Sequence, residues 1–388
     1  PSMKRPRKIA VLTTSRADYG LLYWLMRAVH GSRDLRLQLM ACGSHLGRAF
    51  GGSIRQIRED GLPIAAELDT LPRREDGAGL ARAIGLGTAR FGEAFSRLRP
   101  DLLVVLGDRY ELLCAACAAV AARLPIAHIH GGESTEGVLD EQVRHALTKL
   151  SHIHFTAAEL YRRRVIQMGE DPRRVFNVGA LGLESIRRLS PVPRPELERR
   201  LRFDLGSDFI LATYHPDSLS EGLGAGNVNT LLDALQRARL RAVFTYANAD
   251  AGGREINRKL RAFAARRPGS AAVVPTLGQD GWLSLMRLAK AVVGNSSSGI
   301  IEAPSLKVPT VNIGDRQRGR LRSPSILDCE PSAPAILKAL RLALSPAFRR
   351  RCTGKNAYGT GESARLMLGV LKAVPLGEEL LKKSFYDR

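Results

Sequence analysis

The chain has 388 residues, of which 44% are hydrophobic and 25% charged, and its formal charge is +21 at pH 7. This is the composition of a globular protein with room for two domains, and it contains no apolar run near the ~20 residues of a membrane-spanning helix. The five cysteines are scattered and odd in number, so we expect no disulfide framework and a reducing, cytoplasmic location.

The strong positive charge raises nucleic acid as a partner, which is the non-enzyme alternative. The charge is spread over the whole length, however, and aromatic residues for base stacking make up only 5%. No nucleic-acid-binding motif is present. We therefore predict no nucleic-acid and no membrane partner, and expect the positive field to favour small anionic substrates.

The first half of the chain alternates short apolar runs with helical patterns. We predict strands at 8–15, 35–43, 101–108, 125–132, 152–158 and 174–182. We predict helices between them at 20–30, 78–98, 110–123 and 138–150. Continuous apolar strands separated by helices indicate a parallel sheet that is covered on both faces.

A proline-rich, charged segment at 190–205 interrupts this alternation, and we interpret it as a linker. The pattern then restarts, with predicted strands at 208–216, 240–250, 271–278, 290–299 and 308–315. The fold class is therefore α/β, with two doubly wound Rossmann-like domains that face a cleft. We expect the domains at 1–188 and 189–369, with a C-terminal helix at about 370–388 that returns to the first.

The clearest phosphate-binding pattern is VVGNSSSGIIEAP at 292–304, where a strand ends in small residues and a helix begins. Small residues let backbone N–H groups approach an oxyanion, and a helix N-terminus favours negative charge. Ser296 and Ser297 add hydroxyl donors, and Glu302 can accept from ribose hydroxyls. The simpler alternative is an ordinary serine-capped helix.

Two further motifs place charged residues at predicted strand ends in the first half. In TSRADYG, Arg16 can fork onto a diphosphate, while Asp18 orients it or touches a sugar. The alternative there is a turn with a capping aspartate. In LGDRYE, Asp108 and Arg109 directly follow a buried strand, where a cleft residue belongs; a surface ion pair is the alternative.

The segment that follows the strand at 125–132 is rich in ionisable groups. On the predicted helix, two opposite-charge pairs lie one turn apart, namely Asp140 with Arg144 and Glu141 with His145. Such pairs are usually only exposed ion pairs. A converging cluster of carboxylates and a histidine can instead hold one carboxyl protonated and another ionised, as acid–base catalysis requires. The candidates for that cluster are Asp108, Glu133, Asp140 and His145.

Two histidine pairs, His128 with His130 and His152 with His154, raise the question of a metal. Side chains two apart in a strand point the same way, so each pair can share a ligand. The further carboxylate or cysteine of a zinc site is not found at a recognisable spacing, so we predict no metal.

In the second half, polar residues again follow predicted strands. His215 lies in TYHPDS, Asn248 and Asp250 lie in YANADAGG, and Arg316 lies in NIGDRQRGR. Each alone fits an ordinary loop. Because all of them lie at the carboxyl ends of one predicted sheet, together they indicate a lined cleft.

Taken together, the motifs resemble the hydrolysing branch of the UDP-N-acetylglucosamine 2-epimerase family. In chain order they are TSRADYG, GSHL, GDRYE, HIHGGE…DEQVRHALTKLSHIH, YHP, NADAG and GNSSSGIIEAP…PTVNIGDRQRGR, covering about 8–370. Non-hydrolysing relatives carry GTRPE-like and VEAGLRT-like segments where this chain has TSRADYG and HIHGGE. The resemblance implies a fold like that of GT-B glycosyltransferases, self-association as a dimer or tetramer, and no metal or nicotinamide cofactor.

The resemblance also implies a reaction in two steps. A base removes the proton at C2 while the diphosphate leaves C1, giving a 2-acetamidoglucal and UDP, and water then adds to the double bond from the same face. The implied acid–base residues are Asp108, His130, Glu133, Asp140 and His145. The implied sugar contacts are Asp18, His45, Arg109, Arg144, His215, Asn248 and Asp250. The implied nucleotide contacts are Arg16, Ser296, Ser297, Glu302 and Arg316.

Several alternatives stay open at this point. Some relatives have a carboxylate where this chain has His130, so the base at C2 is His130, Glu133 or Asp140. The substrate is UDP-N-acetylglucosamine, which gives N-acetylmannosamine for sialic acid, or the 2,4-diacetamido-2,4,6-trideoxy sugar of legionaminic acid synthesis. The nucleobase of the substrate is uracil or guanine. A GT-B glycosyltransferase is the alternative enzyme class.

Overall fold

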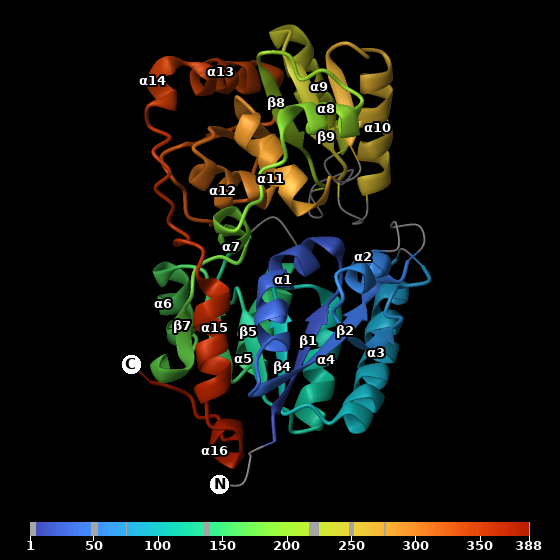
Figure 1. The fold of residues 1–388 in the computed structure, drawn as a ribbon, viewed down its shortest axis with the longest axis vertical. Helices are drawn as coiled ribbons and strands as arrows, with labels where there is room; N and C mark the ends of the chain where they lie inside the picture. The colour runs from blue at the N-terminus through green and yellow to red at the C-terminus, as the bar shows by residue number, and fades with distance from the viewer. Residues whose placement is uncertain are drawn as a thin grey trace. The chain divides into compact units, whose positions relative to one another are not determined.

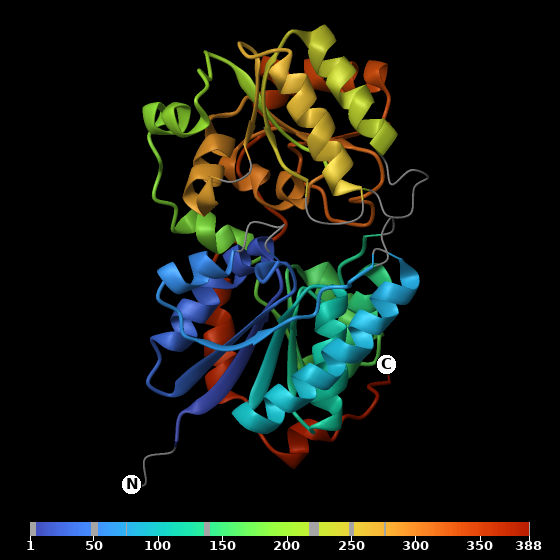
Figure 2. The same cartoon turned by 90° about the vertical axis from the view of Figure 1, so that its right-hand side faces the viewer.

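The computed structural model describes residues 5–47, 53–74, 76–135, 140–216, 225–247, 252–274 and 277–387. The chain divides into two compact units. Unit 1 comprises Pro1–Glu133, Asp140–Glu184 and Gly361–Arg388, and unit 2 comprises Ser134–Leu139 and Ser185–Thr360. Each unit is a parallel sheet with helices packed on it, seen as ribbons in Figures 1 and 2.

The sheet of unit 1 has seven parallel strands in the order β3-β2-β1-β4-β5-β6-β7. They are β1 (Arg7–Thr13), β2 (Leu35–Cys42), β3 (Ile64–Leu68), β4 (Leu102–Leu106), β5 (Ile126–Ile129), β6 (Ile153–Thr156) and β7 (Val175–Asn177). Every residue of β4, β5 and β6 is buried, which explains their continuous apolar runs. The strand order reverses between β1 and β4, and such a switch point is where doubly wound sheets bind ligands.

The helices of unit 1 cover both faces of this sheet. They are α1 (Arg16–His30), α2 (Ile54–Glu59), α3 (Gly77–Leu98), α4 (Tyr110–Ala121), α5 (Asp140–Leu150), α6 (Glu159–Gln167), α7 (Gly182–Arg187), α15 (Ser363–Ala373) and α16 (Glu378–Leu381). The helices α1 and α15 pack with alternate strand residues on one face, and α3, α4 and α5 pack with the others (Figure 2). Short 3₁₀ turns complete the unit at η1 (Gly43–His45) and η3 (Pro172–Arg174).

Unit 2 repeats this plan with six parallel strands in the order β10-β9-β8-β11-β12-β13. The strands are β8 (Phe209–Thr213), β9 (Arg241–Thr245), β10 (Ala271–Val274), β11 (Ala291–Gly294), β12 (Thr310–Ile313) and β13 (Ile326–Cys329). The helices are α8 (Arg194–Leu201), α9 (Ala225–Ala238), α10 (Gly253–Ala265), α11 (Gly278–Leu288), α12 (Ser297–Ile301), α13 (Ala333–Leu344) and α14 (Pro346–Arg349), with the 3₁₀ turn η5 (Ala303–Leu306). The helices α9, α10 and α13 pack on one face, and α8 and α11 pack on the other.

The structure confirms the predicted fold class of two doubly wound α/β domains. It corrects the interpretation of 190–205 as a linker, because this segment contains α8, whose Leu197 is buried in unit 2. The strand predicted at 174–182 is also too long, since β7 ends at Asn177 and a helix begins at Gly182. Among the described residues, no helix combines the length and the apolarity needed to cross a membrane.

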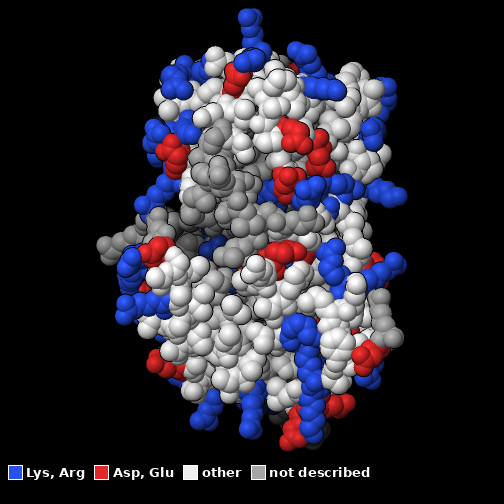
Figure 3. Space-filling model, turned by 180° about the vertical axis from the view of Figure 1, so that it is seen from behind, with Lys and Arg blue, Asp and Glu red and all other residues white. Residues whose placement is uncertain are grey.

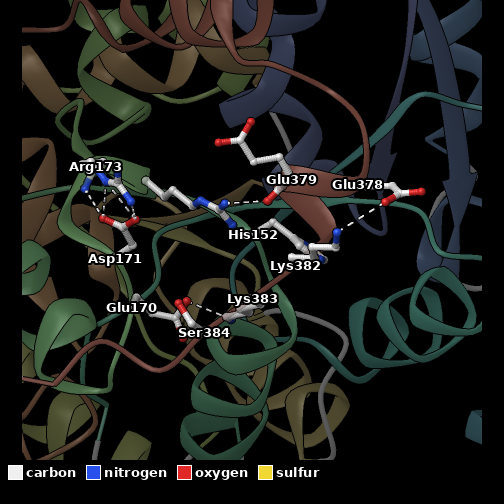
Figure 4. A pocket seen from close by; sticks show the side chains of 10 residues that line it. His152, Glu170, Asp171, Arg173, Glu378, Glu379, Lys382, Lys383 and Ser384 are labelled. Carbon is white, nitrogen blue, oxygen red and sulfur yellow. Dashed lines mark hydrogen bonds and ion pairs between the residues drawn. The ribbon is translucent and has the colours of Figure 1, made fainter.

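The C-terminal segment after α16 packs on unit 1 through a buried ion cluster. The carboxylate of Glu170 lies 2.8 Å from the Lys383 ammonium and 2.9 Å from Nε2 of His154. Lys383 also donates to the backbone carbonyls of Lys149 and Ser151, at the C-terminus of α5, at 2.6 Å each. The cluster borders a cavity of about 490 Å³, where other charges pair locally (Figure 4). One lysine thus ties the C-terminal segment to both Glu170 and the end of α5.

Replacing Lys383 by Met is expected to destabilise unit 1 by about 1–3 kcal/mol, because it removes charge-assisted hydrogen bonds while keeping the apolar stem. Lys382→Met is the matched control. The Lys382 side chain is 79% exposed and pairs only with the exposed Glu378 among the described contacts, so its change should stay within about 0.5 kcal/mol. The free energy of unfolding of unit 1 is measured in urea by the fluorescence of Trp24, in a Trp282→Phe background. Equal losses of stability for Lys383→Met and Lys382→Met would contradict the role given to Lys383.

The same cluster makes stability depend on pH. Burial alone would raise the pKa of Glu170, but hydrogen bonds from His154, Lys149 and Lys383 lower it to about 2. The folded pKa lies below the ordinary value of 4.5, so Glu170 contributes stability that is present above pH 4.5. That contribution is lost as the pH falls toward 2.

Candidate active site

The loop after β1 is shaped by Asp18. Its carboxylate accepts from the backbone N–H groups of Thr14 and Ser15, at 2.7 Å each, and from the hydroxyls of Thr13, Thr14 and Ser15. Ser15 caps α1 in return, which completes a capping box. The described contacts of Asp18 are therefore those of a loop-forming residue, and Arg16 begins the helix that this loop starts.

His45 lies in η1 beside the same loop. Its Nε2 lies 2.9 Å from the Thr13 hydroxyl, and its Nδ1 lies 2.7 Å from the Ser53 hydroxyl. Burial lowers the pKa of His45, although the charge of Asp18 opposes the shift. The imidazole is therefore a neutral hydrogen-bonding group within unit 1.

Arg109 is held by the buried carboxylate of Glu111, two residues along the chain. Both Arg109 Nε and Nη2 lie 3.2 Å from oxygens of Glu111, whose side chain is fully buried. A Cβ at Gly43 would lie 2.6 Å from a Glu111 oxygen and 2.8 Å from the Thr14 carbonyl oxygen. Only glycine at 43 lets the end of β2 approach this carboxylate so closely.

Arg144 is the hub of the acidic groups in unit 1. Its guanidinium is buried and donates to Asp108, to a Glu141 carboxylate oxygen at 2.5 Å, and to the Glu133 backbone carbonyl at 3.1 Å. Burial opposes its charge, but the carboxylates of Asp108, Glu133 and Glu141 raise the pKa of Arg144. The side chain therefore stays a cation that gathers β4, the loop after β5 and α5 around one point.

Glu141 joins His145 to this hub. One of its oxygens lies 2.5 Å from Arg144 and the other lies 3.2 Å from Nε2 of His145. The predicted Glu141–His145 pair is thus present on α5, and Glu141 also pairs with Arg144 three residues along. Asp140 is the first residue of this helix and lies one position before Glu141.

His130 and Glu133 form a second pair just beyond β5. His130 has a positive φ of 66°, so the chain turns out of the strand at this residue. Its Nδ1 lies 3.4 Å from a Glu133 oxygen, and its Nε2 accepts from the Leu181 backbone N–H at 3.5 Å. This arrangement places the imidazole proton on Nδ1, facing the Glu133 carboxylate.

Unit 1 therefore pairs the predicted Asp108 with the predicted Arg144, joins His145 to Arg144 through Glu141, and places His130 against Glu133. The histidine pairs do not join acidic or sulfur ligands into a metal-like set: among the described residues, no three His, Cys, Asp or Glu side chains form such a group. His128 and His154 instead make separate hydrogen bonds within the core.

In unit 2, the strand end at Gly294 is built around Asn295. The side-chain oxygen of Asn295 accepts from the His215 N–H at 2.7 Å, and its amide nitrogen donates to the His215 carbonyl at 2.9 Å. The backbone carbonyl of Asn295 accepts from Arg316 at 3.2 Å and from Gln317 at 2.9 Å. One buried asparagine thus fixes both the predicted His215 and the predicted Arg316.

The serine-rich turn follows directly. Ser296 is the N-cap of α12, with its hydroxyl accepting from the Ser298 N–H at 3.4 Å, and Ser297 is the first helical residue. Glu302 is buried at the end of that helix, and burial raises its pKa. The predicted sugar contacts Asn248 and Asp250 lie outside the described residues.

The two parallel sheets, each with polar side chains at the carboxyl ends of its strands, define a GT-B-like α/β protein. The sequence matches the profile of the UDP-N-acetylglucosamine 2-epimerase family over residues 27–372. A Campylobacter jejuni protein described as GDP/UDP-N,N'-diacetylbacillosamine 2-epimerase (hydrolyzing) is 39% identical over 327 residues, 84% of each chain. A Legionella pneumophila UDP-N,N'-diacetylbacillosamine 2-epimerase (hydrolyzing) is 33% identical over 97% of this chain and 98% of its own.

The chain therefore belongs to the UDP-N-acetylglucosamine 2-epimerase family. The solved structures support the fold: a Neisseria meningitidis UDP-GlcNAc 2-epimerase bound to UDP-GlcNAc superposes with a TM-score of 0.79 at 15% identity. That superposition covers 94% of this chain and 99% of the other.

Sequence reasoning missed three residues that hold the candidate side chains: in unit 1, Glu111 and Glu141 as a bridge between Arg144 and His145, and in unit 2, Asn295. A signal existed for Glu111 and Asn295, because each lies within a motif already recognised, GDRYE and GNSSSG. No signal marked Glu141 as that bridge, because residues three and four apart on a helix are both neighbours, and only the packed structure shows that Glu141 contacts Arg144 and His145 together.

Proposed function

We propose that this protein is a hydrolysing nucleotide-sugar 2-epimerase that acts on UDP-2,4-diacetamido-2,4,6-trideoxyglucose, releasing UDP and the free 2-epimeric sugar. The observation that carries the proposal is the cluster in which Asp108, just after β4, meets Arg144 of α5, with Glu141 and His145 of the same helix joined to it, within the hydrolysing sequence pattern. The names of the two hydrolysing relatives support the choice of sugar.

The first step breaks two bonds of the sugar. A base in unit 1, which is His130, Glu133 or Asp140, takes the C2 proton while the C1–O bond to the diphosphate breaks, so that a C1–C2 double bond forms. The negative charge passes to the departing UDP. Cationic donors such as Arg16 and Arg316, with the hydroxyls of Ser296 and Ser297, suit that charge.

The second step adds water across the double bond. Hydroxyl oxygen bonds to C1 and a proton is delivered to C2 from the same face, which inverts C2 overall. A site that holds several ionisable groups around one buried cation supports such a sequence, because one group can act as base while another is protonated.

The experiment that tests the proposal is NMR of the reaction in D₂O with two substrates in parallel, the diacetamido trideoxy UDP-sugar and UDP-N-acetylglucosamine. We expect UDP and the free manno-configured sugar with deuterium at C2, faster from the diacetamido substrate. Faster turnover of UDP-N-acetylglucosamine would favour the second candidate substrate, which the family name and the bound ligand of the Neisseria structure support.

The same spectra separate the rival classes. A GT-B glycosyltransferase would release no free sugar labelled at C2 in the absence of an acceptor. A nucleic-acid-binding protein would leave both substrates intact and bind duplex or single strands in a salt-sensitive way. On the face shown in Figure 3, Lys and Arg are scattered among Asp and Glu and form no continuous stripe, which does not favour that reading.

A further inference from the structure

His128 lies at the centre of unit 1, next to the acidic hub but outside every role assigned so far. Its side chain is fully buried in β5. Its Nε2 lies 2.7 Å from the carbonyl oxygen of Gly107, and its Nδ1 lies 3.3 Å from the hydroxyl of Thr148. The ring therefore contacts two separate elements, the turn after β4 and the helix α5.

The contact with Gly107 acts directly on Asp108. A carbonyl can only accept, so Nε2 carries the imidazole proton and donates it. The Gly107 carbonyl belongs to the peptide plane that leads into Asp108. Gly107 has a φ of +89° and no side chain, and its N–H donates to the Ile129 carbonyl of β5 at 3.0 Å. With His128 in place, both ends of this glycine are tied to β5, so the orientation of the next residue is fixed.

The contact with Thr148 affects Arg144, which is the ion-pair partner of Asp108. Thr148 lies one helical turn after Arg144, and its hydroxyl lies 3.0 Å from the Arg144 carbonyl. A Cβ at Gly131 would lie 3.0 Å from both His128 Nδ1 and the Thr148 hydroxyl, so this side of the ring is closely packed. His128 thus spans the two elements that present Asp108 and Arg144 to each other.

The ring does not exchange protons with a substrate. Burial lowers the pKa of His128 to about 3, although the hydrogen bond to the Gly107 carbonyl opposes the shift, and the side chain is fully enclosed. A neutral, enclosed donor can hold its neighbours but cannot act as the acid or base itself.

We propose that His128 is a positioning residue, which fixes the geometry of the Asp108–Arg144 pair through the Gly107 carbonyl and through α5. This inference rests on the proposed function, because the pair must serve the epimerase reaction for its geometry to affect turnover. Loss of the donor should then lower kcat and leave KM nearly unchanged, since misplacing a reacting group mainly raises the barrier of the chemical step.

The test compares His128→Gln, which carries an amide donor about as far from the backbone as Nε2, with His128→Asn, which is too short to reach Gly107. Gln38→Leu is the matched control: Gln38 is a buried residue of β2 that donates to the Leu98 backbone carbonyl at 2.9 Å, so it loses the same kind of bond away from the hub. UDP release from the sugar that the wild-type protein turns over is measured, with circular dichroism and melting temperature for each variant.

We expect His128→Asn to lower kcat at least 30-fold, on the order of a misplaced catalytic group, with KM changed less than about 3-fold. His128→Gln should recover most of the loss, and Gln38→Leu should keep wild-type kcat. A wild-type protein that releases no UDP from either sugar would refute the proposed function itself. The positioning role would be overturned if the wild type is active and His128→Asn has the same kcat. It would also be overturned if kcat falls equally in His128→Gln, His128→Asn and Gln38→Leu.

Discussion

Replacing Asp108 by Asn is expected to lower kcat by about 10²–10⁴-fold while UDP binds as before. The amide keeps the size of the carboxylate and can still accept from Arg144, but it cannot take up a proton and it removes a charge beside a buried guanidinium. The nucleotide contacts proposed at Ser296, Ser297 and Arg316 belong to unit 2 and are left unchanged. Turnover is measured by UDP release and UDP affinity by titration calorimetry.

The matched control is Asp101→Asn. Asp101 lies at the opposite, amino end of the same strand, where its carboxylate pairs with the exposed Arg5 and accepts from the Lys8 N–H. We expect a small loss of stability and wild-type kcat. Asp140→Asn should resemble Asp108→Asn, and if both of these variants keep near-normal turnover, the acid–base assignment is wrong.

Replacing Gly294 by Ala is expected to destabilise unit 2 by about 2–6 kcal/mol, through an unfavourable backbone conformation and overpacking. Gly294 has a φ of +134°, and a Cβ there would lie 1.9 Å from the Thr213 carbonyl oxygen. The backbone of β11 would have to move away from β8. Because Asn295 follows directly, its two hydrogen bonds to His215 should weaken and UDP affinity should fall as well.

Gly314→Ala provides the comparison. Gly314 also has a positive φ, +71°, but no atom within 4 Å of the added Cβ, so only the backbone penalty of about 1–2 kcal/mol applies. The chain has two tryptophans, and a Trp24→Phe background leaves Trp282 as the fluorescent reporter of unit 2 during urea unfolding. Equal losses of unfolding free energy in Gly294→Ala and Gly314→Ala would show that the close approach to Thr213 does not contribute to the cost.

Most of the fold could be predicted because its central strands are buried on both faces. The run 101–108 predicts β4 (Leu102–Leu106) closely, since every residue of that strand is buried. The edge strands β3 and β13 were missed because they are short and only partly enclosed: two of the five residues of β3 are buried, and none of the four residues of β13 is. Helix α8 was hidden in the same way: only one of its residues is buried, and prolines precede a charged surface.

The site could be predicted as far as strand ends determine it. Asp108 and Glu133 follow strands of the sheet in unit 1, and His215 follows a strand of the sheet in unit 2; each parallel sheet brings the residues that follow its strands to its own carboxyl edge. Their partners could not be predicted, because Arg144 reaches Asp108 only after α5 packs against the sheet, and Glu111 is buried only because Gly43 leaves room for it. The roles of Asn248 and Asp250 stay predictions from the motif alone.

Unit 1 takes its residues from both sides of unit 2 in the sequence, and this order affects synthesis on the ribosome. Unit 2 is, apart from a short segment, the continuous run Ser185–Thr360, whereas unit 1 needs Gly361–Arg388 as well. Those last residues include α15, whose Met367 and Leu371 are fully buried against the sheet and α1. The unit that emerges first is therefore completed last, and during translation the apolar face that α15 covers stays exposed until these residues have been made.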